Sequence, residues 1–119
     1  MARKRLKRME MKVCMALSAV WVAQMQFKAK NNKYASSLDT LIQGKFLTRD
    51  SVTLMTHKIK IISADENSWA AVATPQPNSP IKRHYYTDKR GEIRYSDSGP
   101  ADKDSPVFKA GESPLPRTK

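Results

Sequence analysis

The chain has 119 residues, the length of one small domain, and its 22 Lys and Arg against 11 Asp and Glu give a formal charge of +11. Its single cysteine, Cys14, excludes an internal disulfide and any zinc site built from several cysteines. Two histidines and four scattered glycines disfavour a multi-histidine metal centre and a glycine-rich phosphate loop. The sequence therefore predicts a protein that is not an enzyme, with no catalytic residue, metal site, cofactor or small-molecule substrate.

The positive charge is concentrated at the N-terminus, where residues 1–12 contain six bases and one acid. Residues 97–119 contain four bases and four acids, so that end of the chain is neutral. A basic block attracts phosphate-bearing partners, either nucleic acid or anionic lipid. It also commonly flanks a helix that binds a membrane or a partner protein, which is the interpretation that we favour here.

The N-terminal apolar stretch, Val13 to Phe27, has three interpretations. A basic start followed by apolar residues resembles a secretory signal, but cleavage after Ala19 or Ala23 would place a bulky side chain three residues before the cut. A membrane-spanning helix needs about 20 apolar residues, and this stretch is shorter. The third interpretation is an amphipathic helix.

Periodicity supports the amphipathic helix, because one stripe of side chains recurs at steps of three and four. Residues 3–30 contain no glycine or proline, which predicts a helix about 42 Å long. A compact domain of this size is only about 35 Å across, so the helix should extend beyond its own sheet and pack against a partner helix there. The expected packing residues are Leu6, Met9, Val13, Leu17, Val20 and Phe27.

A second, shorter helix is predicted over 37–47. Asn31 and Asn32 should end the first helix, since asparagine tolerates the left-handed conformation found after helix ends. Ser36 and Asp39 then form a start similar to a capping box. The apolar positions of the short helix are Leu38, Leu41 and Ile42.

A sheet is predicted over 53–95. Alternation over 53–62 places Met55, His57, Ile59 and Ile61 on one face and lysines on the other, as in a half-buried strand. Residues 69–74 form a second apolar run, and the loop 75–80 contains three prolines.

The last two strands, 83–87 and 92–95, flank the turn sequence Asp88-Lys89-Arg90-Gly91, which is a strong hairpin signal. The resulting fold class is α+β, with a long N-terminal spine helix packed on a roughly four-stranded antiparallel sheet. Residues 1–96 form the domain, and 97–119 form an irregular tail rich in proline and serine.

The residues that could carry chemistry have simpler structural interpretations. His57 lies on a predicted strand without a partner signal, so we expect a structural histidine rather than a base. Cys14 lies on the apolar stretch and is expected to be a buried, inert thiol. The spacing of Asp97, Asp102 and Asp104 matches no calcium-binding loop.

The most suggestive binding cluster lies on the hairpin, where bases and aromatic residues interleave. On a sheet, such side chains can follow phosphates and stack on bases. Its candidate anion-binding or nucleic-acid-binding residues are Arg83, Tyr85, Lys89, Arg90 and Arg94. The alternative is a solvated outer sheet face with its tyrosines half in the core.

Two segments resemble the type IV pilin and pseudopilin family. In Ala16–Leu47, an alanine- and glutamine-containing helix end leads into a Tyr-Ala-x-x-Leu-x-x-Leu element, as it does in that family. These positions are Tyr34, Ala35, Leu38 and Leu41. The second segment follows the family's Trp-x-Ala-x-Ala-x-Pro and Tyr-x-Asp-x-x-Gly-x-Ile-Arg patterns. The matching residues are Trp69, Ala71, Ala73, Pro75, Tyr86, Asp88, Gly91, Ile93 and Arg94.

The resemblance covers residues 10–96, whereas the family's prepilin leader has no counterpart in residues 1–12. The resemblance implies a globular pilin half, either one whose shaft helix is supplied by another chain or a domain expressed without its shaft. The expected function is that of a structural subunit or accessory domain of a type IV pilus or related secretion filament, at the cell surface or in the periplasm. Its expected partners are a helical pilin shaft chain and copies of itself. A small basic nucleic-acid-binding protein that uses the 82–95 hairpin is the alternative.

Overall fold

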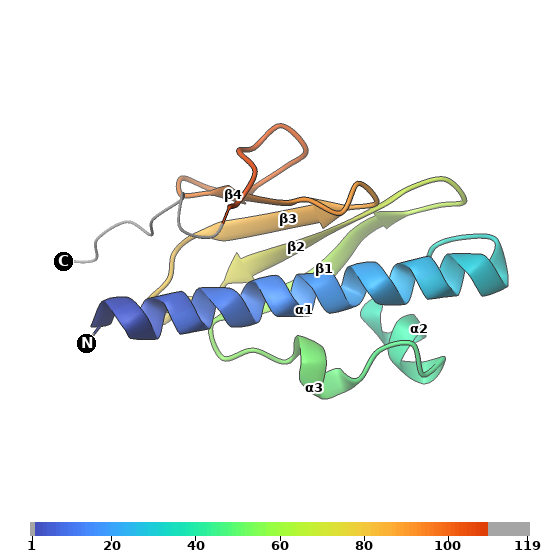
Figure 1. Ribbon diagram of the computed structural model, residues 1–119, viewed down its shortest axis with the longest axis horizontal. Coiled ribbons are helices and arrows are strands. Elements are labelled where there is room, and N and C mark those ends of the chain that lie inside the picture. Colours follow the sequence, from blue (N-terminus) through green and yellow to red (C-terminus); the bar gives the residue numbers. More distant parts are fainter. Residues whose placement is uncertain (1, 110–119) are drawn as a thin grey trace.

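A computed structural model describes residues 2–109 of the chain, except for the side chains of residues 2–4. The fold is α+β, as predicted, with a long N-terminal helix and a four-stranded antiparallel sheet (Figure 1). The helices are α1 (Ala2–Asn31), α2 (Leu38–Gln43) and α3 (Arg49–Val52). The strands are β1 (His57–Ala64), β2 (Trp69–Pro75), β3 (His84–Asp88) and β4 (Ile93–Ser96).

Helix α1 is the long axis of the molecule. Its 30 residues correspond to about 45 Å, and the longest extent of the molecule is 46 Å. The helix ends where predicted, because Asn32 adopts a left-handed backbone with φ 62° and its N–H still bonds to the carbonyl of Lys28.

The predicted short helix over 37–47 is wrong at its ends. The cap is Ser37 rather than Ser36, and its hydroxyl accepts the N–H of Thr40 at 3.2 Å. Helix α2 stops at Gln43, because Lys45 turns the chain with φ 65°. The extra turn α3 was not predicted, since its four residues have no clear apolar period.

The sheet runs in the order β1-β2-β3-β4, with every neighbouring pair antiparallel. His57, Ile59 and Ile61 are buried and the intervening lysines are exposed, which confirms the alternation predicted for β1. The inward placement of Met55 was wrong: the strand begins only at His57, and the Met55 side chain is 93% exposed.

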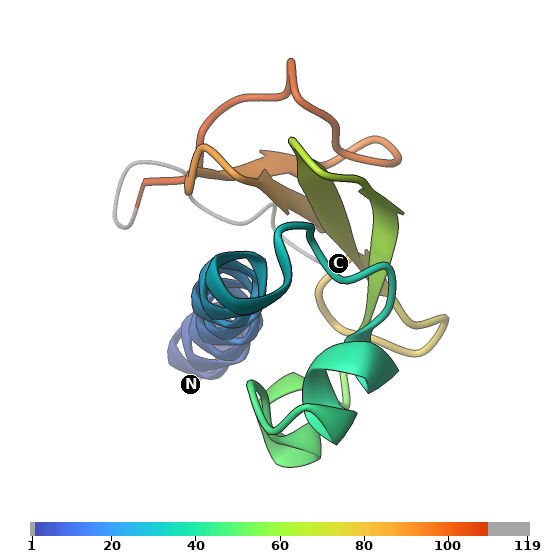
Figure 2. The ribbon, with the colours of Figure 1, turned by 90° about the vertical axis from the view of Figure 1, so that its right-hand side faces the viewer.

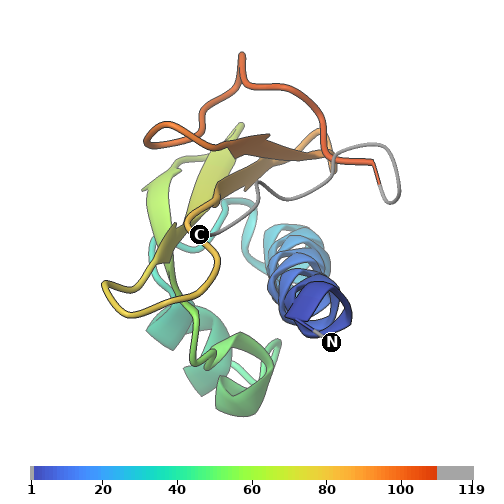
Figure 3. The same ribbon diagram turned by 90° about the vertical axis from the view of Figure 1, so that its left-hand side faces the viewer.

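The molecule has two layers. Helix α1 lies against one face of the sheet, with α2 and α3 beside it (Figures 2 and 3). Residues from α1, the sheet and the segment 35–47, which includes α2, form the main core, whose largest side chains include Leu17, Leu41, Trp69 and Tyr85. A smaller cluster of Ala70, Tyr86 and Ala101 lies apart from it. Most of the clustered buried apolar residues therefore belong to one core, to which both α1 and the sheet contribute.

The tail predicted over 97–119 is irregular as far as residue 109, yet part of it pairs with the sheet. Arg94 and Val107 form an antiparallel bridge, and Tyr95 N–H donates to the carbonyl of Pro106 at 3.0 Å. The remaining part of that prediction, 110–119, lies outside the described residues. The free edge of β4 is thus covered by the chain itself.

Candidate functional site

The buried face of α1 contains most of the residues that were predicted to contact a partner helix. Val13, Leu17 and Val20 have no exposed surface, and Phe27 is only 9% exposed. Leu6 and Met9, nearer the N-terminus, are partly buried. A partner helix has no access to the four buried side chains from Val13 to Phe27, because the chain's own sheet and short helices cover them.

The opposite face of α1 carries a second apolar stripe that was not predicted. Its large apolar side chains are Met11, Met15, Val22 and Met25, which are 58%, 65%, 47% and 51% exposed. Ser18 lies between them, so the steps along the helix are four, three, four and three residues. With 100° per residue, these five positions span an arc of about 80°, directly opposite the buried face. We call this set the outer stripe.

The outer stripe was missed because the two stripes share one apolar stretch. Only the stripe that runs from Leu6 to Phe27 was interpreted as a packing face. The step of 3.5 residues was present in the sequence as the series 11, 15, 18, 22 and 25.

Several basic side chains lie near the N-terminal end of the outer stripe. Arg5, Lys7, Arg8 and Lys12 are exposed, and no ion pair joins them to another described side chain. Charges placed this way favour an anionic partner at this end of the helix.

A buried polar network fixes the first half of α1 to the sheet. Glu10 is 6% exposed, and its Oε2 accepts hydrogen bonds from Tyr85 Oη at 2.5 Å and from Arg83 Nη1 at 3.2 Å. Arg83 also donates to both carboxylate oxygens of Asp97, at 2.7 and 3.1 Å, and lies over the ring of Tyr95. Burial, together with the bond to Glu10, raises the pKa of Tyr85 far above its usual value.

The same network removes two residues from the predicted nucleic-acid surface. Arg83 is 2% exposed and Tyr85 is fully buried, so neither can reach a phosphate or a base. The predicted interface placed both on an outer face, because a basic-aromatic run gives no sign of which face each side chain occupies.

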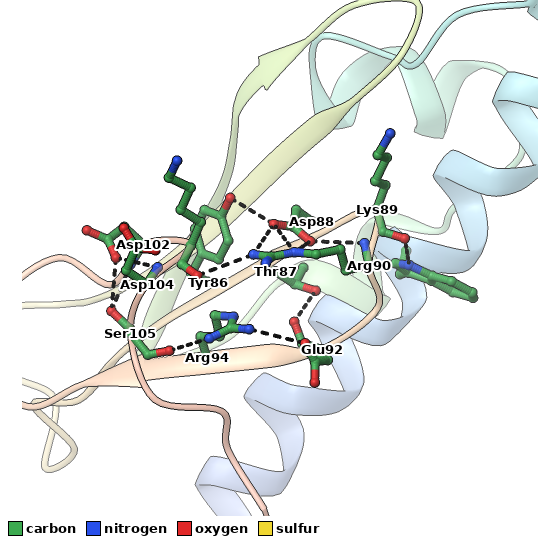
Figure 4. Close-up of polar contacts among 12 residues, drawn as sticks. Tyr86, Thr87, Asp88, Lys89, Arg90, Glu92, Arg94, Asp102, Asp104 and Ser105 are labelled. Atoms are coloured by element: carbon green, nitrogen blue, oxygen red, sulfur yellow. Dashed lines mark hydrogen bonds and ion pairs between the residues drawn. The ribbon is translucent and has the colours of Figure 1, made fainter.

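The other basic side chains of the hairpin are exposed or partly exposed but already bonded, as Figure 4 shows for Arg90 and Arg94. Arg90 donates to Asp88 at 2.8 Å, and Arg94 donates to Glu92 at 3.2 Å and to the carbonyl of Ser105 at 2.7 Å. Lys89 Nζ donates to the carbonyl of Asn67 at 2.9 Å. Hence the hairpin offers far less free positive charge than its sequence suggested.

His57 and Cys14 have structural roles in this fold. His57 Nε2 donates to the carbonyl of Arg83 at 2.8 Å, which leaves Nδ1 to accept from the hydroxyl of Thr56 at 2.9 Å. Burial lowers the pKa of His57. Burial, with nearby Glu10, raises the pKa of Cys14 to about 12, so its thiol is unreactive near neutral pH. Among the described residues, no three His, Cys, Asp or Glu side chains group as metal ligands.

A depression of about 620 Å³ lies where α1 meets the turn after β1, between Phe27, Tyr34 and Asp65. The Asp65 carboxylate in its wall accepts the N–H groups of Asn67 and Ser68 at 2.7 and 2.8 Å. That carboxylate therefore closes the turn itself, and the outer stripe remains the stronger candidate site.

No helix within residues 2–109 has an apolar segment long enough to cross a lipid bilayer. A scan of the sequence against protein-family models finds no match, and a search of curated proteins finds none either.

Proposed function

We propose that the chain is a non-enzymatic structural subunit or accessory domain of a type IV pilus or related secretion filament, and that α1 packs against the helix of another chain. The outer stripe carries this proposal: it is a solvent-exposed apolar seam on a helix whose opposite face is already buried. Four of the six exposed large apolar side chains in the described structure lie on this one helix face.

The spacing of the outer stripe suits a helical partner. Apolar residues at alternating steps of three and four form the seam by which two helices pack side by side. Three of the four large side chains are methionines, which adapt to partners of different shape. Each such side chain contributes about 1.5–3 kcal/mol when fully buried, before the cost of association is subtracted.

The residues of the pilin resemblance support the same proposal. Tyr34 and Trp69, one from each matching segment, lie 6.5 Å apart between ring centres under the C-terminal half of α1. Trp21 of α1 packs at Gly91 in the hairpin turn and donates to the carbonyl of Lys89 at 3.2 Å. In the proposed assembly these contacts hold the helix on the domain, while a pilin shaft chain or further copies cover the outer stripe at the cell surface or in the periplasm.

Photo-crosslinking in cells tests this function. A photoreactive amino acid replaces Met15 or Val22 in the full chain, and Gln43, exposed at the end of helix α2, is the matched control position. We expect crosslinks from Met15 and Val22 to a polypeptide with a long apolar helix, or to a second copy, identified by mass spectrometry. The variant M15E/V22E should lose the same complexes while keeping its circular dichroism spectrum.

Crosslinks to lipid alone would contradict the proposal and would indicate that α1 lies on a membrane surface. So would polypeptide crosslinks that are equally strong from Gln43, or complexes that survive M15E/V22E.

A further inference from the structure

The two edge strands of the sheet differ in whether another segment of the chain pairs with them. The edge of β4 is covered by the chain's own segment 105–108, whereas β1 forms the other edge. Gln76 N–H donates to the carbonyl of Thr56, and this bond shows which residues of β1 form hydrogen bonds with β2, namely every second residue counted from Thr56. In the alternate residues His57, Ile59 and Ile61, the backbone N–H and C=O groups point away from β2. No backbone hydrogen bond from another described segment reaches these three residues. His57 is only 1% exposed, so the accessible backbone groups of this edge are those of Ile59 and Ile61, which are 7% and 6% exposed.

The side chains along this free edge combine charge and apolar surface. Lys58 and Lys60 are exposed, and neither forms an ion pair with a described residue. Met55 lies just before the strand with 93% of its surface exposed, and Ile62 lies at the bulge near its end with 51% exposed. These are the two exposed large apolar side chains of the described structure that do not belong to α1.

A shallow groove of about 340 Å³ lies on the outer faces of β1 and β2, and Lys58 and Lys60 form part of its wall. Its other walls are Val72, Thr74 and the segment 75–77. A chain lying along β1 could therefore place side chains beside the lysines, with apolar surface next to them.

We propose that the free edge of β1 binds an extended segment of another protein, which adds a fifth strand and carries acidic residues at alternate positions. The open N–H and C=O groups would bind its backbone, and Lys58 and Lys60 would face its carboxylates. A second copy of this chain is a poor occupant, because pairing β1 with β1 brings lysines close to lysines at an already basic edge. This surface is separate from the outer stripe, so the inference does not rest on the proposed function.

Peptide binding to the full chain tests the inference. The probe is a fluorescent nine-residue peptide of alternating valine and glutamate. Its binding is measured by fluorescence anisotropy at low salt. We expect saturable binding, and slower amide hydrogen exchange at Ile59 and Ile61 in the complex. The variant K58E/K60E should bind this peptide about tenfold more weakly, because two favourable cross-strand charge pairs become unfavourable. It should instead bind the peptide in which lysine replaces glutamate.

Three controls separate an added strand from simple attraction of charge. The variant K33E/K103E removes the same charge from exposed sites elsewhere and should bind as the parent does. A glutamate peptide with a central proline cannot form the ladder and should bind weakly. The variant K58Q/K60Q, which is folded if its circular dichroism is unchanged, should lie between the parent and K58E/K60E.

Four results would overturn the inference: no binding at millimolar peptide, equal loss in K33E/K103E, equal binding of the proline peptide, or unchanged exchange at the amides of Ile59 and Ile61. Displacement by a single-stranded oligonucleotide with the same dependence on Lys58 and Lys60 would assign the edge to nucleic acid instead.

Discussion

Glu10 and Tyr85 are 75 positions apart in the chain, yet the Tyr85 hydroxyl donates to Glu10 Oε2 at 2.5 Å in the interior. Glu10 is the one acid in the basic N-terminal block, and it faces the sheet while Lys7, Arg8 and Lys12 are exposed to solvent. A buried carboxylate is tolerated only when donors satisfy it, here Tyr85 and Arg83. The pair therefore fixes which face of α1 meets the sheet, and so which face carries the outer stripe.

Glu10→Gln should lower the free energy of unfolding by about 2 kcal/mol, since hydrogen bonds to a charged group are lost while Arg83 and Tyr85 stay buried. Urea unfolding measures this change. The matched control is Glu66→Gln on the exposed turn after β1, which should change stability by less than about 0.5 kcal/mol. Equal effects of the two substitutions would show that the buried bonds contribute nothing to stability.

The stability of the protein should fall as the pH drops below about 6.5, the ordinary pKa of histidine. Burial lowers the pKa of His57 in the folded state, so the unfolded chain binds the proton more readily and acid favours unfolding. The slope contributed by one such histidine is at most about 1.4 kcal/mol per pH unit, and it should disappear in His57→Gln.

His84 is the matched control for this pH dependence. Burial also lowers its pKa, but it is only partly buried, so His84→Gln should remove a smaller part of the slope. Urea unfolding at pH 7.5 and pH 5.5 measures both variants. If the free energy of unfolding of His57→Gln still falls with pH as steeply as that of the parent, the pH dependence does not come from His57.

Much of the fold could be predicted because local signals agree with the tertiary structure. The helix end at Asn32, the alternation of β1 and the hairpin turn at Gly91 each rest on the conformational preferences of a few residues. The existence of α2 was predicted but its start was misplaced, because the position of a cap depends on which of two adjacent serines can reach the backbone.

The candidate site was less predictable, for a different reason. Periodicity shows that α1 has an apolar stripe, but burial of one stripe by the chain's own sheet depends on contacts that are distant in sequence. Arg83 shows the same limit: its sequence neighbours are basic and aromatic, whereas its ion-pair partners are Glu10 and Asp97. Neither pairing has a signal in local sequence.

Gly91→Ala should lower stability by about 1–2 kcal/mol. Gly91 has φ +84°, a conformation that alanine adopts with strain, and an added Cβ would lie 3.3 Å from the Trp21 indole. Thermal unfolding measures the loss. Gly91→Asn is the informative comparison, because asparagine tolerates positive φ but still adds a Cβ. If both variants lose the same stability, contact with Trp21 dominates; if neither loses any, the turn does not constrain the helix.

Two matched double variants decide whether the hairpin or the N-terminus of α1 attracts phosphate. K7Q/R8Q and K89Q/R90Q each remove one lysine and one arginine. Lys7 and Arg8 form no ion pair with a described residue, whereas Arg90 is bonded to Asp88 and Lys89 to a carbonyl. Any binding of duplex DNA at low salt should therefore weaken in K7Q/R8Q, with a logarithmic salt slope smaller by about two.

K89Q/R90Q should leave that affinity and slope nearly unchanged, as gel shifts over a salt series would show. The reverse result would mean that phosphate competes successfully with Asp88 for Arg90. The bond between them would then be exchangeable, and the hairpin would return as the nucleic-acid interface predicted from the sequence. The comparison is decisive because both variants have the same net charge, so a difference between them reflects only where the free bases lie.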